Sequence, residues 1–427
     1  MPATLADWLS YLESLHPKTI ALGLERVAQV RQRLNLQPAF PLITVGGTNG
    51  KGSTCAMLEA MLRAGGYRVG CYTSPHLLEY NERVRIDKAQ ASDAELCAAF
   101  AQIERARGEI PLTYFEFGTL AAMLCFVGRG VDVAILEVGL GGRLDAVNVF
   151  DADCAVVTSV DIDHVDYLGD TREAIAYEKA GIFRGGKVAV FGDRDMPQNI
   201  ALEAQRVGAE LWRIGADFDY TAARQWDFRG KHGARHALPY PALRGAYQLN
   251  NASAALAALD ALRDDLSLSD DAVRAGLAEV TLPGRFQIVS HHPQTIFDVA
   301  HNPHAARALA QNLAALPPAR VFAVFAMLKD KDIAGVIQAL RDRVDIWLVA
   351  GIDAPRGATM DETAQALRQA GVPQGALQTF NTVTEALRGA RKQAGENDRI
   401  VAFGSFYTVA EAMRASAETQ DGKTNLG

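Results

Sequence analysis

Residues 46–53 form a glycine-rich loop, Gly-Gly-Thr-Asn-Gly-Lys-Gly-Ser, between an apolar stretch at 42–45 and a helix-like stretch at 55–63. Glycines allow several backbone N–H groups to point at one anion, and the N-terminus of the following helix adds partial positive charge. Lys51 can then reach the outer phosphates of a nucleotide, and the Ser53 hydroxyl can lie near Mg²⁺. The spacing therefore predicts a loop that binds a nucleoside triphosphate.

This loop differs from the common P-loop pattern at two positions. Val45 stands six residues before Lys51, where glycine is usual, and Gly52 separates Lys51 from Ser53. A glycine-rich turn of purely structural origin is the alternative. A lysine between two glycines at a strand-to-helix junction nevertheless favours phosphate binding.

Three polar residues at the ends of apolar stretches are candidate metal ligands. A magnesium carboxylate in an α/β nucleotide enzyme tends to stand at the end of a buried strand, which suits Glu137. The alternative for Glu137 is an ion pair with Arg143. His164 is a second candidate, although a lone histidine is more often structural. Ser74 can either ligate Mg²⁺ or cap a helix.

A second polar cluster lies in the last third of the chain. Asp298 and His301 stand at the end of an apolar stretch, the edge where open sheets bind ligands, and Arg285 precedes them. We expect Asp298 to contact ribose hydroxyls and Arg285 to contact phosphate from the far side of an interdomain cleft. The spacing around Lys179, taken alone, predicts only a charged side chain on the surface.

Composition limits the class of protein. The chain has 427 residues, of which 49% are hydrophobic, and this favours two domains. A net charge of −7 without a long basic run argues against nucleic acid as the main partner. Five widely spaced cysteines without a C-x-x-C pair suit reduced thiols. No leader-like start and no apolar run of membrane-spanning length occurs, so we expect a cytoplasmic protein without a membrane partner.

Short apolar stretches alternate with helical ones, which indicates an α/β fold with parallel sheets. Aromatic residues alternate with polar ones and glycines at 217–240, which predicts a small antiparallel insertion at the edge of the first sheet. We place the domain boundary near 282–286. Residues 1–283 then form a P-loop-type parallel-sheet ATPase domain, and residues 284–427 form a smaller Rossmann-like α/β domain. The second domain lacks G-x-G-x-x-G, so no dinucleotide is implied.

Taken together, these motifs resemble the Mur ligase superfamily, and within it the bacterial dihydrofolate synthase/folylpolyglutamate synthase family. The resemblance runs from about residue 11 to residue 408, and the two differences in the loop are the family's own form. It is carried by residues 46–53, 73–77, 136–145, 163–164, 178–182, 283–286 and 298–304.

The resemblance implies ATP-dependent amide formation. A substrate carboxylate would attack the γ-phosphate of ATP, and the amine of L-glutamate would attack the resulting acyl phosphate. The implied acceptors are 7,8-dihydropteroate, tetrahydrofolate and the folate polyglutamates. Two Mg²⁺ ions and Lys51 would neutralise the charge that gathers between the phosphates and the carboxylate.

The resemblance also implies roles for single residues. Ser74 and Glu137 would hold the first Mg²⁺ and His164 the second, and the family's counterpart of Lys179 is carbamylated. The residues expected to hold the triphosphate are Thr48, Asn49, Gly50, Lys51, Gly52 and Ser53. The residues expected to complete the ATP site are Asn251, Arg285 and Asp298. The residues expected to be catalytic are Lys51, Lys179, His164 and His301.

A pterin-bearing substrate is expected in the first domain. An aromatic residue next to an acid suits a flat heterocycle with amino groups, by stacking and hydrogen bonding. The expected substrate-binding residues are Ala21, Leu22, Thr113, Tyr114, Phe115, Glu116, Leu144, Asp145 and Ala146. The alternative is that the aromatic residues belong to the hydrophobic core. Residues 112–117 resemble the bifunctional enzymes more than those restricted to polyglutamylation.

Three other functions are alternatives to this one. A monofunctional folylpolyglutamate synthase would share the fold and use only reduced folates. A UDP-muramoyl-peptide ligase would need a separate N-terminal domain, and the 45 residues before the loop leave no room for it. A P-loop regulatory NTPase would not need the cluster around Asp298, and its ATP hydrolysis would not depend on glutamate. A two-domain ligase of this kind is expected to work as a monomer.

Overall fold

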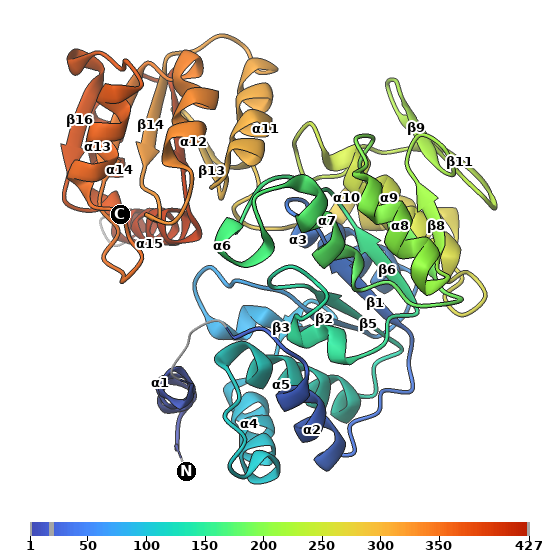
Figure 1. Cartoon of the computed structure of the whole chain (residues 1–427). Coiled ribbons are helices and arrows are strands. Elements are labelled where there is room, and N and C mark those ends of the chain that lie inside the picture. The colour runs from blue at the N-terminus through green and yellow to red at the C-terminus, as the bar shows by residue number, and fades with distance from the viewer. Residues whose placement is uncertain (1, 17–20, 425–427) are drawn as a thin grey trace. The chain divides into compact units, whose positions relative to one another are not determined.

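The protein is represented by a computed structural model that describes residues 2–16 and 21–424 (Figure 1). The chain divides into two compact units. Unit 1 comprises residues 1–242 and 248–281, and unit 2 comprises residues 243–247 and 282–427. Within the described residues, no helix is long and apolar enough to cross a membrane.

Unit 1 is built on an eight-stranded sheet with the order β4-β3-β2-β5-β1-β6-β7-β8. Strands β2, β5, β1, β6, β7 and β8 are parallel, and at one edge β3 pairs antiparallel with β2 and β4 pairs antiparallel with β3. Bulky apolar residues fill the central strands, which are buried along their whole length. The strands are β1 (Leu42–Gly46), β2 (Val69–Tyr72), β3 (Val84–Ile86), β4 (Ala89–Gln90), β5 (Val133–Glu137), β6 (Cys154–Val157), β7 (Val188–Phe191) and β8 (Glu210–Arg213).

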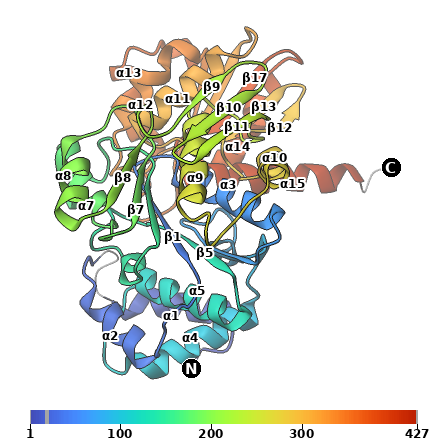
Figure 2. The ribbon, with the colours of Figure 1, turned by 90° about the vertical axis from the view of Figure 1, so that its right-hand side faces the viewer.

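Helices cover both faces of this sheet. Helices α3, α9 and α10 lie on one side, and α1, α2, α4 and α5 lie on the other (Figure 2). Unit 1 contains α1 (Leu5–Leu15), α2 (Glu25–Arg33), α3 (Lys51–Ala64), α4 (Asp93–Arg107), α5 (Tyr114–Arg129), α6 (Val165–Leu168), α7 (Arg172–Ala180), α8 (Gln198–Val207), α9 (Gln248–Ala261) and α10 (Asp270–Glu279). Two short 3₁₀ helices, η1 (Tyr80–Arg83) and η2 (Ala146–Val149), lie in loops near the candidate site.

The predicted antiparallel insertion is present. Strands β9 (Asp219–Ala222), β10 (Trp226–Gly230) and β11 (Gly233–Leu238) form a sheet of their own in the order β11-β10-β9. Trp226 and Phe228 are fully buried beneath it. The insertion therefore buries two large aromatic side chains, and it does not extend the hydrogen bonding of the main sheet.

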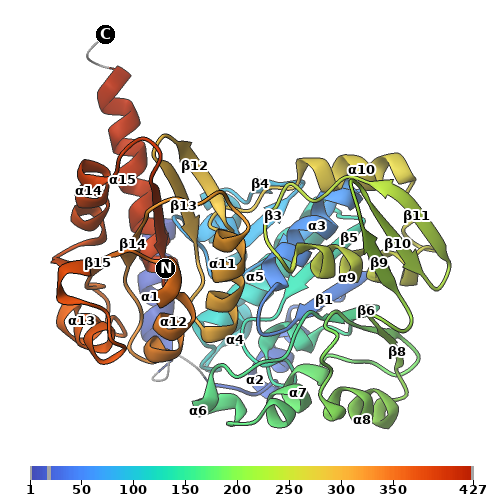
Figure 3. The ribbon, with the colours of Figure 1, turned by 90° about the horizontal axis from the view of Figure 1, so that it is seen from above.

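Unit 2 is a second α/β layer structure. Its six-stranded sheet has the order β12-β13-β17-β14-β15-β16, in which only β12 is antiparallel. Helices α14 and α15 pack together, and α11, α12 and α13 form a second row (Figure 3). Its elements are β12 (Gln287–His291), β13 (Gln294–Asp298), α11 (Pro303–Ala314), β14 (Val321–Phe325), α12 (Ile333–Leu340), η3 (Arg341–Arg343), β15 (Ile346–Ala350), α13 (Met360–Gln369), η4 (Gln374–Ala376), β16 (Leu377–Phe380), α14 (Val383–Gln393), β17 (Arg399–Phe403) and α15 (Phe406–Thr424).

Unit 2 also takes in residues 243–247, a short segment between β11 and α9. The Ala246 backbone N–H donates to Asn312 Oδ1 at 2.8 Å. The Tyr247 ring lies with its centroid 5.3 Å from that of His304. Unit 2 is therefore assembled from two separate stretches of the chain.

Helices α10 and α3 pack so closely that adding one methyl group at their contact should disturb the packing. A Cβ added at Gly276 on α10 would lie 2.5 Å from Met61 Cα on α3. We expect Gly276→Ala to lower the free energy of unfolding by about 1–3 kcal/mol, because the two backbones must separate. Chemical denaturation measures this change.

The matched control is Gly128→Ala in α5, where an added Cβ would meet no atom within 4 Å. Alanine favours a helix more than glycine does, so this variant should gain about 0.5–1 kcal/mol. Equal behaviour of the two variants would contradict the packing of α10 on α3.

Candidate active site

The glycine-rich loop leaves β1 at Gly46 and enters α3 at Lys51. Gly47 and Gly50 have φ values of +144° and +89°, which side chains disfavour. A Cβ at Gly47 would lie 1.9 Å from Thr158 Oγ1, and a Cβ at Gly50 would lie 2.4 Å from Asn251 Oδ1. Both glycines are therefore required by backbone conformation and by close neighbours.

Residues that follow β6 hold this loop in place. The Thr48 N–H donates to the Ser159 carbonyl at 2.8 Å, and the Thr158 hydroxyl donates to the Asn49 carbonyl at 2.6 Å. The Asp161 N–H donates to Thr48 Oγ1 at 3.0 Å. Thr158 and Ser159 were not predicted to support the loop. A Thr-Ser pair directly after a buried strand is the sequence pattern that could have indicated this role.

Lys51 and Asn251 both lie at the loop. Lys51 Nζ donates to the carbonyls of Gly47 and Thr48 at 3.0 and 3.2 Å. Asn251, in the first turn of α9, donates to Gln248 Oε1 at 3.0 Å, and Gln248 Nε2 lies 3.5 Å from Ser53 Oγ. The start of α9 thus contacts the loop, and the role of Asn251 in the ATP site stays a prediction.

Ser74 and Glu137 are brought together from neighbouring strand ends. The Ser74 backbone N–H donates to Glu137 Oε2 at 3.0 Å, and Glu137 is buried. The alternative, an ion pair between Glu137 and Arg143, is wrong, because Arg143 pairs with Glu178 at 2.8 Å. The sequence placed this serine and this carboxylate at the same edge of the sheet, and the geometry agrees.

His164 lies on the loop before α6. It has a φ of +53°, its backbone N–H donates to Asp163 Oδ1 at 2.8 Å, and about a third of its side chain is exposed. Among residues 2–16 and 21–424, no three His, Cys, Asp or Glu side chains cluster as a metal site. Mg²⁺ at a nucleotide usually takes one or two carboxylates plus phosphates and water. The metal roles of Ser74, Glu137 and His164 stay predictions.

Lys179 is buried in the last turn of α7, so its reading as a surface charge from spacing alone was wrong. Burial, together with the positive charge of Lys51, lowers the pKa of Lys179 to about 7. Asp163 and Asp145 act in the opposite direction. Four charged side chains therefore act on one another at this place.

Asp145 is the buried acid of the candidate substrate site. Burial raises the pKa of Asp145 to about 6, although its carboxylate accepts the backbone N–H groups of Leu140 and Val147 at 2.8 and 3.0 Å. Asp145 caps η2, whose first residue is Ala146. An acid held in this way is available to donate or accept near neutral pH.

The three segments expected to bind substrate come together in unit 1. The Gly23 N–H donates to the Leu144 carbonyl at 3.3 Å, which joins residues 21–23 to the loop before η2. A Cβ at Gly139 would lie 2.7 Å from the Phe115 ring and 3.2 Å from Asp145 Oδ2. Tyr114 and Phe115 are half-buried, as are Ala21 and Leu22. These aromatic residues therefore keep part of their surface outside the core.

Glu116 is held by other residues of the protein. Its Oε2 accepts the Thr113 N–H at 2.7 Å in a capping box at the start of α5. Arg26 pairs with Glu116 at 3.0 Å and donates to the Ala21 carbonyl at 2.7 Å. Arg26 thus connects two of the expected substrate segments, although no sequence pattern singled it out.

The polar cluster of unit 2 gathers around Phe406. Asp298 ends β13 and accepts the Phe286 and Ala300 N–H groups at 2.9 and 2.8 Å. Burial raises the pKa of Asp298, and the positive charge of Arg285 opposes that rise.

Arg285 lies over the Phe406 ring at 5.2 Å, and the His301 ring lies 6.1 Å from the same ring. The three predicted residues of this unit are therefore neighbours. Phe406, the first residue of α15, had no sequence signal that set it apart from core aromatics.

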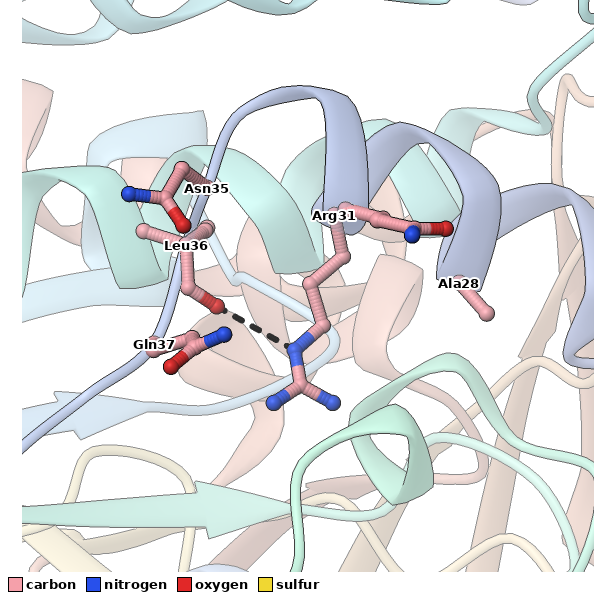
Figure 4. A pocket seen from close by; sticks show the side chains of 6 residues that line it. Ala28, Arg31, Asn35, Leu36 and Gln37 are labelled. Atoms are coloured by element: carbon pink, nitrogen blue, oxygen red, sulfur yellow. Dashed lines mark hydrogen bonds between the residues drawn. The ribbon is translucent and has the colours of Figure 1, made fainter.

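A surface depression of about 430 Å³ lies elsewhere, beside α2 (Figure 4). Arg31 crosses it and donates from Nε to the Leu36 carbonyl at 3.1 Å. It is lined by Ala28, Arg31, Gln32, Asn35, Leu36 and Gln37. None of the predicted site residues lines it, so it does not mark the candidate site.

Comparison with known families and curated proteins gives matches along the chain. Residues 45–259 match the Mur ligase middle domain, and residues 284–406 match the Mur ligase, glutamate ligase domain. The dihydrofolate synthase/folylpolyglutamate synthase of Escherichia coli strain K12 is 50% identical over 412 residues, which are 96% of this chain and 94% of that protein.

Solved structures show the same similarity. E. coli FolC in complex with DHPP and ADP has 49% identity and a TM-score of 0.94, over 98% of this chain and 100% of that chain. A bifunctional folylpolyglutamate synthase/dihydrofolate synthase with Mn, AMPPNP and L-glutamate bound has 50% identity and a TM-score of 0.90. That match covers 97% of this chain and 98% of the other.

The lowered pKa of Lys179 makes stability depend on pH. The unfolded chain keeps the proton on this amine to about pH 10, whereas the folded chain loses it near pH 7. The folded state therefore binds fewer protons between these values, and folding becomes more favourable as pH rises. In CO₂-free buffer, wild type should gain about 1–3 kcal/mol over Lys179→Met between pH 6 and pH 9.

Urea denaturation at the two pH values measures this difference. A stability difference between wild type and Lys179→Met that does not change with pH would show that the folded amine titrates normally.

Proposed function

The chain belongs to the Mur ligase family, and we propose that it is an ATP-dependent ligase that adds L-glutamate to 7,8-dihydropteroate and further glutamates to reduced folates. The observation that carries this proposal is its full-length similarity to bifunctional dihydrofolate synthase/folylpolyglutamate synthases. The residues of the candidate site support it, because different groups of them are suited to bind a phosphate, a carboxylate and a flat heterocycle.

The reaction needs activation because a carboxylate is a poor electrophile. A carboxylate oxygen of the acceptor attacks the γ-phosphorus of ATP, and ADP leaves with the electrons of the broken P–O bond. The amine of L-glutamate then attacks the acyl carbon, inorganic phosphate leaves, and the amine loses a proton. Each cycle forms one amide bond and converts one ATP into ADP and phosphate. The protein mainly positions the three reactants and stabilises negative charge.

The glycine-rich loop is proposed to hold the triphosphate. Gly47 and Gly50 leave no space for a side chain, so the loop's N–H groups form a cradle of fixed shape. Lys51 already folds over the loop and would move its ammonium group from the loop carbonyls to phosphate oxygens. The remaining proposed contacts are Thr48, Asn49, Gly52, Ser53 and Asn251.

Magnesium is proposed to bind at two places, Ser74 with Glu137 and the side chain of His164. Carboxylate and hydroxyl oxygens are preferred ligands of Mg²⁺, and buried Glu137 stands beside Ser74, so the donor set at the first place fits. When bound, Mg²⁺ neutralises phosphate charge and lowers the barrier to attack by a carboxylate.

Lys179 is proposed to be carbamylated. A buried amine with a pKa of about 7 is unprotonated in about half of the molecules at neutral pH, and only the unprotonated amine reacts with CO₂. The product is an anion, so repulsion from Lys51 would become attraction. The carbamate would then help to organise the second metal place near His164.

The pterin ring is proposed to lie between Phe115 and Asp145, which meet at Gly139. Stacking on Phe115 and hydrogen bonds from ring amino groups to Asp145 suit a flat heterocycle. The residues proposed to complete this site are Ala21, Leu22, Thr113, Tyr114, Glu116, Leu144 and Ala146. Glu116 would act by holding Thr113 and Arg26, because its carboxylate is already engaged by them.

In unit 2, Arg285 and Asp298 are proposed to contact ATP, with His301 beside them. Arg285 and His301 both lie against Phe406, and the charge of Arg285 acts on Asp298, which supports a common role. We also propose that the enzyme acts as a monomer in the cytoplasm on small-molecule substrates, without nucleic acid or membrane as partners. The five free cysteines, four of which are buried, suit a reducing compartment.

The test is phosphate release with Mg·ATP and L-glutamate, run in parallel with 7,8-dihydropteroate and with tetrahydrofolate. We expect turnover with both acceptors and a product mass increased by one glutamate residue. Activity with tetrahydrofolate alone would identify a monofunctional folylpolyglutamate synthase. Phosphate release that needs no glutamate would identify a P-loop NTPase and contradict the proposal.

The proposed first metal place predicts a changed magnesium requirement. Glu137→Gln removes the negative charge and keeps the shape, so the Mg²⁺ concentration for half-maximal activity should rise by at least about tenfold. A Mg²⁺ titration of the phosphate-release rate measures this.

Glu95→Gln is the control, because Glu95 pairs with Arg129 at the surface. This variant should leave the magnesium requirement unchanged. An unchanged requirement in Glu137→Gln would remove Glu137 from the metal site.

A further inference from the structure

Arg83, the last residue of η1, is held in an unusual setting beside the candidate substrate site. Its guanidinium lies over the Tyr80 ring at 5.3 Å and over the Tyr114 ring at 5.5 Å. Its Nε donates to His76 Nδ1 at 2.8 Å. Tyr80 is buried, and its ring meets the Tyr114 ring edge-on at 5.7 Å. The planar group is thus fixed from three sides.

Among the described residues, Arg83 differs from two other arginines nearby because no carboxylate pairs with it. Arg85, two residues further on, pairs with Glu59 at 2.9 Å, and Arg26 pairs with Glu116 at 3.0 Å. In the part of the chain that the structure describes, no Asp or Glu forms an ion pair with Arg83. An arginine that is oriented by aromatic rings and a histidine, and not neutralised, is suited to bind an external anion.

The surroundings place this cation at the substrate site. Tyr114 is one of the expected substrate residues, and His76 follows Ser74 by two positions. Tyr72, the last residue of β2, is buried nearby. Burial raises the pKa of Tyr72 to about 12, the charge of Arg83 opposes this rise, and Asp145 adds to it. Arg83 and Asp145 therefore lie within electrostatic reach of the same phenol.

The two proposed acceptors differ in one anionic group. In 7,8-dihydropteroate the only carboxylate is the one on the benzene ring, which reacts. In tetrahydrofolate that position is an amide, the γ-carboxylate of the attached glutamate reacts, and an unreactive α-carboxylate branches off beside it. A site that accepts both molecules needs a cation for the α-carboxylate only when a folate is bound.

We propose that Arg83 binds the α-carboxylate of the glutamate on a folate acceptor, and that it thereby serves the polyglutamylation reaction and not the synthesis of dihydrofolate. This inference rests on the proposed function. Tyr80, Tyr114 and His76 orient the guanidinium so that its two Nη groups can pair with both carboxylate oxygens. Arg83 is then a substrate-binding residue that distinguishes the two activities of one site.

The test compares both acceptors in Arg83→Gln. Loss of a charge-assisted pair should raise the KM for tetrahydrofolate roughly tenfold to a hundredfold. The KM for 7,8-dihydropteroate should change by less than about threefold, and this retained activity shows that the variant folds. Equal loss with both acceptors would overturn the proposal, since it would make Arg83 a general support of the site.

A modified substrate identifies the group that Arg83 contacts. With the α-carboxylate of tetrahydrofolate replaced by a carboxamide, wild type should lose the same tenfold to hundredfold, and Arg83→Gln should lose little more. A carboxamide penalty that persists undiminished in the variant would place the α-carboxylate elsewhere and contradict the proposal.

Arg194→Gln is the matched control, because Arg194 also lies over a tyrosine ring, that of Tyr220 at 5.7 Å, but pairs with Asp219. It should leave both KM values unchanged. The outcomes also separate this inference from the proposed function. A wild-type enzyme that uses dihydropteroate and not tetrahydrofolate would contradict both, whereas equal losses in Arg83→Gln would contradict this inference alone.

Discussion

The arrangement of the candidate site depends on the register of β1 between β5 and β6. Val45 lies opposite Glu137 on one side, and Gly46 lies opposite Val157 on the other. Because the three strands are parallel, their chains emerge at one edge, where the loop meets Thr158 and Glu137 meets Ser74. A shift by one residue would turn each side chain to the other face and separate these groups. Full burial of the strands makes that shift costly.

Much of this arrangement could be predicted from the sequence, and the reason is physical. Strand ends and glycine-rich turns are local patterns, so the loop, Glu137 and Ser74 could be placed at one edge before any coordinates. Strands such as β12 and β16 are partly exposed and carry mixed residues without an apolar run, so no local pattern predicts them. Residue pairs that join distant segments, such as Arg26 with Glu116, leave no local signal. Only the tertiary fold selects them.

Lys179 shows how tertiary structure can reverse a local reading. Its position near the end of a helix is one that lysines often occupy in water, yet α7 turns it into the protein beside Lys51, Asp145 and Asp163. Buried Lys179 and half-buried Lys51 lie close to two acids, so a single change of charge would alter the electrostatic balance among them. The fold thus sets the protonation of a group whose sequence context is ordinary, and the resemblance to a known family was the only early reason to select it.

Unit 2 is made from two stretches of chain, and this affects how the protein can be divided. Residues 243–247 belong to it, although they stand between β11 and α9, and Ala246 satisfies the side chain of Asn312. A gene fragment that begins where the glutamate ligase domain begins would leave this amide without its backbone donor and His304 without its tyrosine. The covalent chain therefore crosses from one unit to the other three times. Neither unit is one continuous stretch of sequence, so neither could be exchanged intact with that of a relative by swapping a single gene segment.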